Sequence, residues 1–258
     1  MKLAISGKGG VGKTTLAACL AGTLAQEGRD VIALDADPDA NLASALGVPP
    51  GERIVPLTEM RKLIEERTGA KDGYGQFFKL NPRVDDIPDA FGRRIGPIRL
   101  LVLGGVVRGG AGCMCPASAL LKALLVHLTL GREDHLVMDM EAGIEHLGRA
   151  TARSMDALIV VVNDPGWSLQ TALRVRDLAA DIGLARVFAV ANRMPEGADL
   201  DPIRKALGDV PLLGALPYDP RLGGAVLAAE GDRIAPGEAL AGLRPRIETM
   251  LEEIRGRL

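Results

Sequence analysis

Aromatic residues, cysteines and long apolar runs are all scarce in this sequence. Phenylalanine, tyrosine and tryptophan make up 3% of the 258 residues, so a core has to be built from aliphatic side chains. The three cysteines are a small, odd number, which argues against the disulfide framework of small secreted proteins. No run approaches the roughly 18 apolar residues that a membrane span needs. We therefore expect a cytoplasmic protein without a membrane span.

An excess of basic charge is also missing. The chain has 31 lysines and arginines against 33 acidic residues, a formal net charge of −2. Without a basic field over the molecule, we expect no nucleic-acid partner. The hydrophobic fraction of 47%, by contrast, is ample for a core.

What the sequence does have is a glycine-rich stretch near its start, Gly7-Lys8-Gly9-Gly10-Val11-Gly12-Lys13-Thr14-Thr15. It follows an apolar run and opens a helix-patterned segment, and its spacing is that of a P-loop. Glycines let successive backbone N–H groups face an anion, and the helix start adds partial positive charge. Lys13 would meet the β- and γ-phosphates, and the Thr14 hydroxyl would take a place on Mg²⁺. The residues that we expect around the nucleotide here are Gly9, Gly10, Val11, Gly12, Lys13, Thr14 and Thr15. Because this loop begins so early, we expect no signal peptide.

The rest of the chain alternates continuous apolar runs with helical patterns, which indicates parallel strands in βαβ units. The expected strands are 1–6, 30–34, 98–103, 135–140, 157–162, 187–191 and 211–216, and the expected helices are 15–27, 58–67, 116–130, 169–182 and 245–258. Residues 71–96 show no sustained period, and a connection this long is usually functional or mobile. We predict one α/β P-loop ATPase domain over residues 1–258, a doubly wound, mostly parallel sheet with helices on both faces.

Carboxylates follow two of the predicted strands. Asp37 stands just past the second strand, where open α/β sheets place ligands, and it can orient the attacking water or hold one bound to Mg²⁺. Asp35 and Asp39 are its close competitors, and spacing alone does not choose among the three. Asp139 ends another buried strand and is placed like a Walker B aspartate, which binds Mg²⁺ through water.

Asn192 also follows a strand, and its amide can pair with the edge of a nucleobase. In the Asn-Lys-x-Asp motif of GTPases the final carboxylate reads guanine, but Pro195 occupies that position here. This favours ATP or ADP over guanine nucleotides. Pro217, in a turn after the last strand, is placed to line the same adenine pocket. A structural asparagine at a strand end is the common alternative.

Cys113 and Cys115 lie in a predicted loop just ahead of a helix N-terminus, where thiolates are favoured. Two thiolates at i and i+2 can hold one soft metal ion, but they cannot complete four-coordination. A two-fold axis past this loop would complete a four-thiolate site from two chains. The alternative is two incidental cysteines. Cys19 lies among small apolar residues of the first helix and is expected to be a buried hydrophobe.

Lys8 is not required by the general P-loop pattern. Lys-Gly-Gly-x-Gly-Lys-Thr resembles the deviant Walker A motif of a dimerising ATPase class that includes the nitrogenase iron protein, the arsenite-pump ATPase and the septum-site and plasmid-partition ATPases. The resemblance implies that Lys8 reaches across a two-fold interface to the partner's phosphates. It also favours Asp37 over its neighbours, so Lys8, Lys13 and Asp37 are the expected catalytic residues. A solvated loop lysine is the alternative.

Two further stretches, Gly109–Pro116 and Met138–Arg149, together resemble the carbon monoxide dehydrogenase maturation ATPases, as do Phe78–Pro82 and Val84–Pro88. This resemblance covers nearly the whole chain. It implies a nucleotide-dependent homodimer that assists nickel insertion into the Ni–Fe–S cluster of its client, carbon monoxide dehydrogenase. It also implies that Cys113 and Cys115 bind Ni²⁺ or Zn²⁺ between the subunits. Residues 163–167 depart from the family pattern of Glu-Pro and a basic residue, which bears on partner contacts.

Two other functions stay open. A positioning ATPase that cycles on a membrane or DNA would call for a basic amphipathic tail, but Glu248, Glu252 and Glu253 punctuate the terminal helix. That helix is therefore expected to pack on its own sheet. A redox ATPase with a shared [4Fe–4S] cluster, like the nitrogenase iron protein, would use the same four thiolates. The iron protein, however, draws its two cysteines from separate segments.

Overall fold

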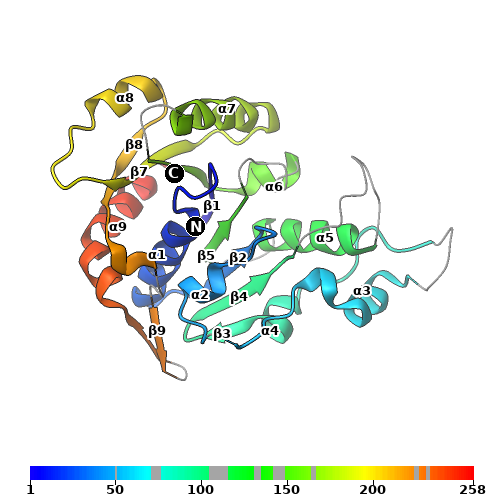
Figure 1. The fold of residues 1–258 in the computed structure, drawn as a ribbon. Coiled ribbons are helices and arrows are strands. Elements are labelled where there is room, and N and C mark those ends of the chain that lie inside the picture. Colours follow the sequence, from blue (N-terminus) through cyan, green and yellow to red (C-terminus); the bar gives the residue numbers. More distant parts are fainter. Residues whose placement is uncertain are drawn as a thin grey trace.

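The computed structural model describes residues 1–49, 51–70, 77–104, 116–130, 135–141, 149–163, 167–223, 227–230 and 233–258. Within them, eight strands form one sheet in the order β3-β4-β2-β5-β1-β6-β7-β8 (Figure 1). Their bounds are β1 (Lys2–Gly7), β2 (Val31–Asp35), β3 (Arg93–Ile95), β4 (Ile98–Val102), β5 (His135–Asp139), β6 (Ala157–Val162), β7 (Val187–Met194) and β8 (Leu212–Pro217). Every neighbouring pair is parallel except β3 and β4, so the predicted mostly parallel α/β sheet is confirmed.

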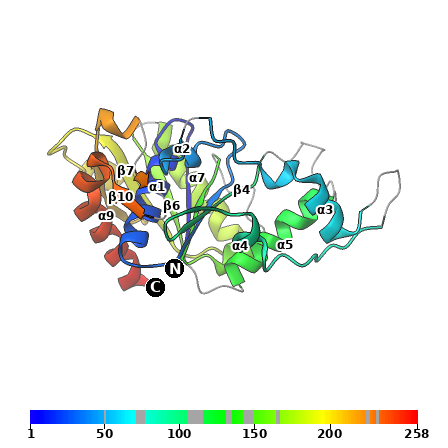
Figure 2. The ribbon, with the colours of Figure 1, turned by 90° about the horizontal axis from the view of Figure 1, so that it is seen from below.

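Helices cover both faces of this sheet (Figures 1 and 2). Their bounds are α1 (Lys13–Gln26), α2 (Leu42–Ala45), α3 (Arg61–Thr68), α4 (Ile87–Phe91), α5 (Pro116–Leu130), α6 (Arg149–Ser154), α7 (Trp167–Ile182), α8 (Asp201–Leu207) and α9 (Glu238–Arg257), with 3-10 turns η1 (Leu57–Glu59) and η2 (Pro220–Gly223). A separate antiparallel hairpin joins β9 (Leu227–Glu230) to β10 (Arg233–Pro236).

The strands read as continuous apolar runs because each of their faces meets a helical layer. Successive residues alternate between two cores: Leu3 and Ile5 pack in the layer with α1, α2 and α9, whereas Ala4 packs in the layer with α3, α5, α6, α7 and α8. All six residues of β6 are buried. This double burial fixes the register of the sheet, and so fixes which residues stand at its carboxyl edge.

Helix α1 begins at Lys13, two positions before the predicted start, and it is buried over most of its length. The sheet lies against it on one side, and α2 and α9 pack on the others. Cys19 is fully buried there, and burial raises the pKa of its thiol to about 12. The expectation of a small buried hydrophobe at this position is confirmed.

The terminal helix α9 begins at Glu238, seven residues before the predicted start at Pro245. Its apolar face (Ile247, Met250, Leu251 and Ile254) is buried against the sheet, as the spacing predicted. Leu258 was predicted on the same face, but its side chain is 46% exposed because it lies beyond the last helical residue. No helix in the described ranges is long and apolar enough to cross a membrane.

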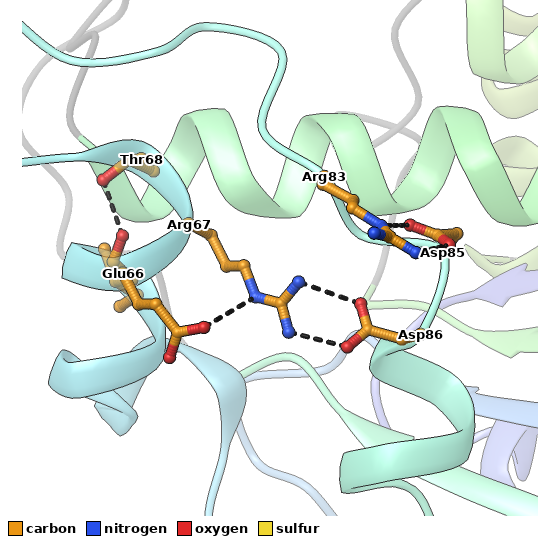
Figure 3. A network of polar contacts seen from close by, with 7 residues as sticks. Glu66, Arg67, Thr68, Arg83, Asp85 and Asp86 are labelled. Atoms are coloured by element: carbon orange, nitrogen blue, oxygen red, sulfur yellow. Dashed lines mark hydrogen bonds and ion pairs between the residues drawn. The ribbon is translucent and has the colours of Figure 1, made fainter.

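The long connection between β2 and β4 has more structure than its weak periodicity predicts. The short helix α4 and the edge strand β3 both lie in it. The Arg67 guanidinium donates two hydrogen bonds to the Asp86 carboxylate, at 3.0 and 2.6 Å, which ties α3 to the start of α4 (Figure 3). The backbone N–H of Lys79 donates to the Thr68 carbonyl at 2.7 Å. In Figure 2, α3 and α5 lie at the end of the molecule opposite to α9.

Candidate nucleotide site

Polar residues predicted for the site gather at the carboxyl edge of the sheet. The P-loop leaves β1, Asp35 ends β2, Asp139 ends β5, and Asn192 lies near the end of β7. Asp35 and Asp139 are paired in register between two adjacent strands. Strands β5, β2 and β4 lie on one side of β1 in the sheet, and β6, β7 and β8 lie on the other. The strand order therefore reverses at β1, and open parallel sheets bind ligands at the carboxyl edge of such a switch point.

The P-loop has the backbone that an anion cradle requires. Gly10 and Gly12 have φ angles of 77° and 99°, in the left-handed region that favours glycine. A Cβ on Gly12 would also lie 2.1 Å from the side-chain nitrogen of Asn192. Lys13 is only 7% exposed, and its ammonium lies 3.5 Å from the Lys8 carbonyl, at the outer limit of a hydrogen bond. Lys8 itself is exposed.

Asp139 is fully buried. Neither of its carboxylate oxygens accepts a hydrogen bond from the described residues. Burial raises the pKa of Asp139 to about 7, and the nearby Thr14 hydroxyl and Lys13 ammonium oppose that rise only in part. A nearby cation would stabilise the ionised form of a buried carboxylate of this kind. Thr14 and Asp139 together therefore supply the hard oxygen ligands that Mg²⁺ prefers.

The three competing aspartates have different surroundings. Asp35 is fully buried, and its two oxygens accept the backbone N–H groups of Asp37 at 3.2 Å and Leu42 at 2.9 Å. Burial raises the pKa of Asp35 to about 6. Asp37 is half-buried, and one of its oxygens accepts the N–H of Asp39 at 3.0 Å, whereas Asp39 is exposed. Asp35 therefore stabilises the turn after β2, and Asp37 is the partly exposed aspartate of the three.

Asn192 lies between the P-loop and a small cavity. Its side-chain N–H donates to the Val11 carbonyl at 2.8 Å, and the residue is 4% exposed. A cavity of about 140 Å³ lies beside it, lined by Thr15, Asn192, Arg193, Pro217, Tyr218, Asp219 and Pro220. Asn192 and Pro217, both predicted for an adenine pocket, thus line one cavity. Two features were not predicted. The hydrogen bond from Asn192 to Val11 joins residues 181 positions apart, and the register of β7 against β8 shifts near Arg193, which leaves no mark in the sequence pattern.

Cys113 and Cys115 lie outside the described residues. The described residues stop at Gly104 and resume at Pro116, the first residue of α5. The end of β4 is fixed beside the candidate site, since the Leu103 N–H donates to the Asp35 carbonyl at 2.9 Å. Within the described residues, no group of three or more histidine, cysteine, aspartate or glutamate side chains could hold a metal ion.

Residues 2–230 match the family of CobQ/CobB/MinD/ParA nucleotide binding domains. The chain is 46% identical, over 222 residues, to the carbon monoxide dehydrogenase accessory protein CooC of Rhodospirillum rubrum, a match that covers 85% of this chain and 84% of that protein. It is 48% identical, over 223 residues, to an uncharacterised ATP-binding protein of Methanocaldococcus jannaschii, covering 85% of this chain and 86% of that protein.

Solved structures show the same fold at lower identity. The cell division protein MinD of Aquifex aeolicus superposes with a TM-score of 0.64 at 22% identity, covering 97% of this chain and 96% of that one. A ParA family ATPase of Chlorobium tepidum superposes with a TM-score of 0.65 at 20% identity, covering 98% and 97%.

Proposed function

The chain belongs to the CobQ/CobB/MinD/ParA nucleotide-binding family and, within it, to the CooC type of ATP-hydrolysing P-loop ATPases, and from this premise we propose that it assists nickel insertion into carbon monoxide dehydrogenase. The observation that carries the proposal is the 46% identity with the Rhodospirillum accessory protein over 85% of this chain. In this proposal two copies associate around bound ATP, and nickel is the cargo rather than a resident cofactor.

The phosphate end of the nucleotide would be held by the P-loop. Backbone N–H groups of the loop and the start of α1 face the phosphates. The Lys13 ammonium exchanges its long contact with the Lys8 carbonyl for the β- and γ-phosphates. Thr14, and Asp139 through water, would hold Mg²⁺, which would neutralise charge on the phosphate oxygens. Asp139 would be held in its ionised form by such a cation, which would offset the burial that raises the pKa of this carboxyl.

Hydrolysis would need a group that orients water toward the γ-phosphate. Asp35 is committed to two backbone N–H groups, and Asp39 is exposed, so the half-buried Asp37 is the best placed of the three. The exposed Lys8 would meet the phosphates of the second subunit, where transition-state charge develops.

The adenine would occupy the cavity beside Asn192. One N–H of the Asn192 amide donates to the Val11 carbonyl, and in this proposal the amide oxygen would be offered to the base. An oxygen accepts from the exocyclic amino group of adenine, whereas guanine presents a carbonyl oxygen at the equivalent position. The site therefore favours ATP over GTP.

The test is nickel-dependent activation of the nickel-free client. Purified apo-carbon monoxide dehydrogenase is incubated with Ni²⁺, Mg²⁺–ATP and this protein, and carbon monoxide oxidation is followed over time. We expect activation that needs ATP and that is lost with Lys13→Ala and with the Cys113→Ala, Cys115→Ala double variant. Lys205→Ala, an exposed lysine on α8, is the matched control. Equal activation with and without this protein would contradict the proposal.

A positioning ATPase is the second candidate, favoured by 29% identity with the septum site-determining protein MinD of Synechocystis over 98% of this chain. The packing of α9 counts against it, since its apolar face is buried on the sheet and is not offered to a lipid surface. Co-sedimentation with anionic vesicles in the presence of Mg²⁺–ATP would favour this second function. A [4Fe–4S] protein would instead show broad visible absorption after anaerobic purification.

A further inference from the structure

We propose that the amino end of β7 carries a second binding site, which takes a small carboxylate with an apolar body. A cavity of about 740 Å³ lies there, which is within the size range of ligand pockets. Helix α7, the start of β7, the loop before β8 and the end of α9 all contribute to its walls. This site is separate from the candidate nucleotide site, so its test is independent of the proposed function.

The cavity lies at the opposite end of β7 from Asn192. Val187 is the first residue of this strand and Asn192 is the sixth, so roughly 16 Å of strand separates them. Val187 packs against the core layer that contains α7 and α8, whereas Phe188 packs in the layer that contains α1 and α9. A cavity lined by both residues therefore crosses the end of the strand, between the two layers. Among the described residues, it shares no lining residue with the cavity beside Asn192.

Arg176 braces one wall of the cavity. Its Nε and Nη2 atoms donate hydrogen bonds to the Asp177 carboxylate at 2.9 and 2.7 Å, and its Nη1 atom donates to the Asp209 carboxylate at 2.6 Å. The bond to Asp209 joins α7 to the loop before β8, and all three nitrogens of the guanidinium are engaged. Both carboxylates are exposed, so they lie toward the rim. This ion cluster therefore shapes the cavity and leaves ligand recognition to the other two arginines that line it.

Arg186 and Arg257 line the same cavity and keep hydrogen-bond donors for a ligand. Among the described residues, Arg186 makes one hydrogen bond, from Nη2 to a main-chain oxygen of Leu258 at 3.0 Å. Arg257 makes one, from Nη2 to the Glu253 carboxylate at 2.8 Å, and its guanidinium carbon lies 6.0 Å from the centre of the Phe188 ring. Within the described structure, the Nε and Nη1 atoms of both arginines are therefore available. A guanidinium presents its N–H groups in a planar fork, and this fork matches the two oxygens of a carboxylate.

The rest of the lining selects among anions. Three arginines and two aspartates line the cavity, so its charged groups sum to +1, which suits a ligand with one negative charge. Seven apolar residues complete the lining, and Phe188 and Val210 among them are buried. Covering these residues with an apolar body is favourable, whereas a small hydrated ion such as chloride would gain nothing from them. The ligand class is therefore a carboxylate attached to an aliphatic or aromatic body.

The test separates the carboxylate from the apolar body. Benzoate is the probe, and benzamide is its uncharged counterpart of similar shape. Saturation-transfer NMR titrations measure their dissociation constants for the parent, Arg186→Gln and Arg257→Gln. We expect the parent to bind benzoate at least about tenfold more tightly than benzamide, and each arginine variant to weaken benzoate binding at least about tenfold, as the loss of a hydrogen bond between charged groups does. Arg244→Gln is the matched control, since Arg244 pairs with Glu248 at 2.7 Å along the same helix but is not among the described residues that line the cavity.

Two further measurements guard the interpretation. Arg186 and Arg257 are exposed, so thermal unfolding of both variants should match that of the parent. Lys13→Ala should bind benzoate like the parent, because the P-loop is a separate place for an anion. Equal affinity for benzoate and benzamide overturns the inference, and so does parent-like benzoate binding by both arginine variants or no benzoate binding by the parent. Benzoate binding that is lost in Lys13→Ala but kept in the arginine variants would place the anion at the P-loop and overturn it as well.

Discussion

Asp35, Asp37 and Asp39 sit within five residues of one another, yet burial and backbone hydrogen bonds divide their roles. Each carboxylate oxygen of Asp35 accepts a backbone N–H, so this side chain fixes the turn. Asp39 is exposed to solvent. The half-buried Asp37 is anchored on one oxygen and has the other free of backbone partners. This arrangement leads to a prediction about each of the three.

Asp37→Ala should bind ATP within about threefold of the parent but hydrolyse it at least about 100-fold more slowly. A group that orients water acts in the transition state, so its loss lowers kcat rather than ground-state affinity. Asp39→Ala should keep near-parent turnover, and Asp35→Ala should lower the unfolding temperature because two buried N–H groups lose their acceptor. Steady-state hydrolysis and equilibrium ATP binding measure these effects. Parent-rate hydrolysis by Asp37→Ala would show that the choice of Asp37 is wrong.

The pKa of Asp139 predicts how the ligand-free protein responds to pH. Burial holds this pKa at about 7 in the folded state, against 3.8 as the ordinary value, and it holds that of Asp35 at about 6. The folded protein therefore binds more protons than the unfolded chain between roughly pH 4 and 7. Stability is highest at the acidic end of that window and falls as the pH rises through the folded pKa.

Thermal unfolding in EDTA at pH 6 and pH 8 checks this. Asp139 should contribute about 1 kcal/mol to the difference, which corresponds to roughly 2–4 °C for a protein of this size. Asp139→Asn should flatten the dependence, whereas Asp39→Asn, an exposed neighbour, should keep the parent slope. Mg²⁺–ADP should act in the opposite sense and stabilise the parent more at pH 8, because the cation binds the ionised carboxylate. The same slope in parent and Asp139→Asn would contradict the assignment.

Sequence spacing predicted which residues lie at the carboxyl edge of the sheet, because strand ends and the P-loop are local features. It did not predict what these residues contact. The Asn192 amide was expected to pair with a nucleobase. In the structure its side-chain nitrogen donates a hydrogen bond to the carbonyl of Val11, 181 positions away in sequence. The left-handed backbone of Arg193 likewise follows from pairing with β8. Contacts between distant segments depend on the assembled sheet and leave no periodic signal.

At the scale of helices and strands, the predictable elements are those with strong apolar patterns. All seven predicted strands are present, since each buries a continuous apolar run. Strand β3 was missed because Arg93 and Arg94 give an edge strand no apolar alternation, and α4, α6 and α8 are each too short to show a helical period. The true start of α9 was missed because the predicted helix began at Pro245, whereas the helix continues through this proline.

Helix α9 should be a main source of stability, because its apolar face completes the core layer on α1. Leu251→Ala removes a fully buried side chain and should cost about 2–5 kcal/mol of unfolding free energy, as large-to-small changes in cores do. Glu252→Ala, the next residue and exposed, should stay within about 0.5 kcal/mol of the parent. Urea unfolding of both variants measures the difference. If Leu251→Ala unfolds like the parent, α9 does not carry this part of the core.

At the scale of the whole molecule, the exposed position of Lys8 predicts coupling between nucleotide and association. If Lys8 of each copy meets the phosphates of the other, ATP binding and dimerisation must favour each other reciprocally. A non-hydrolysable ATP analogue with Mg²⁺ should therefore shift the protein toward dimer in sedimentation velocity, and ADP should do so less. Lys8→Ala should abolish the shift and lower hydrolysis more than nucleotide binding, while Lys205→Ala should behave as the parent. Equal sedimentation with ADP and with the analogue would count against this coupling.

The number of metal ions per dimer is the sharpest test of the assembly. Cys113 and Cys115 provide two thiolates per chain, whereas a closed thiolate site for Ni²⁺ or Zn²⁺ has four ligands. We therefore expect one tightly bound ion per dimer, and we expect the ion to favour the dimer, because only the assembled form supplies the full ligand set. Metal analysis after gel filtration gives the stoichiometry. Cys113→Ala or Cys115→Ala should remove the tight site and spare ATP binding, whereas Cys19→Ala should leave metal binding intact, since that thiol is buried in α1. One tight ion per monomer that survives the double cysteine change would rule out a shared thiolate site.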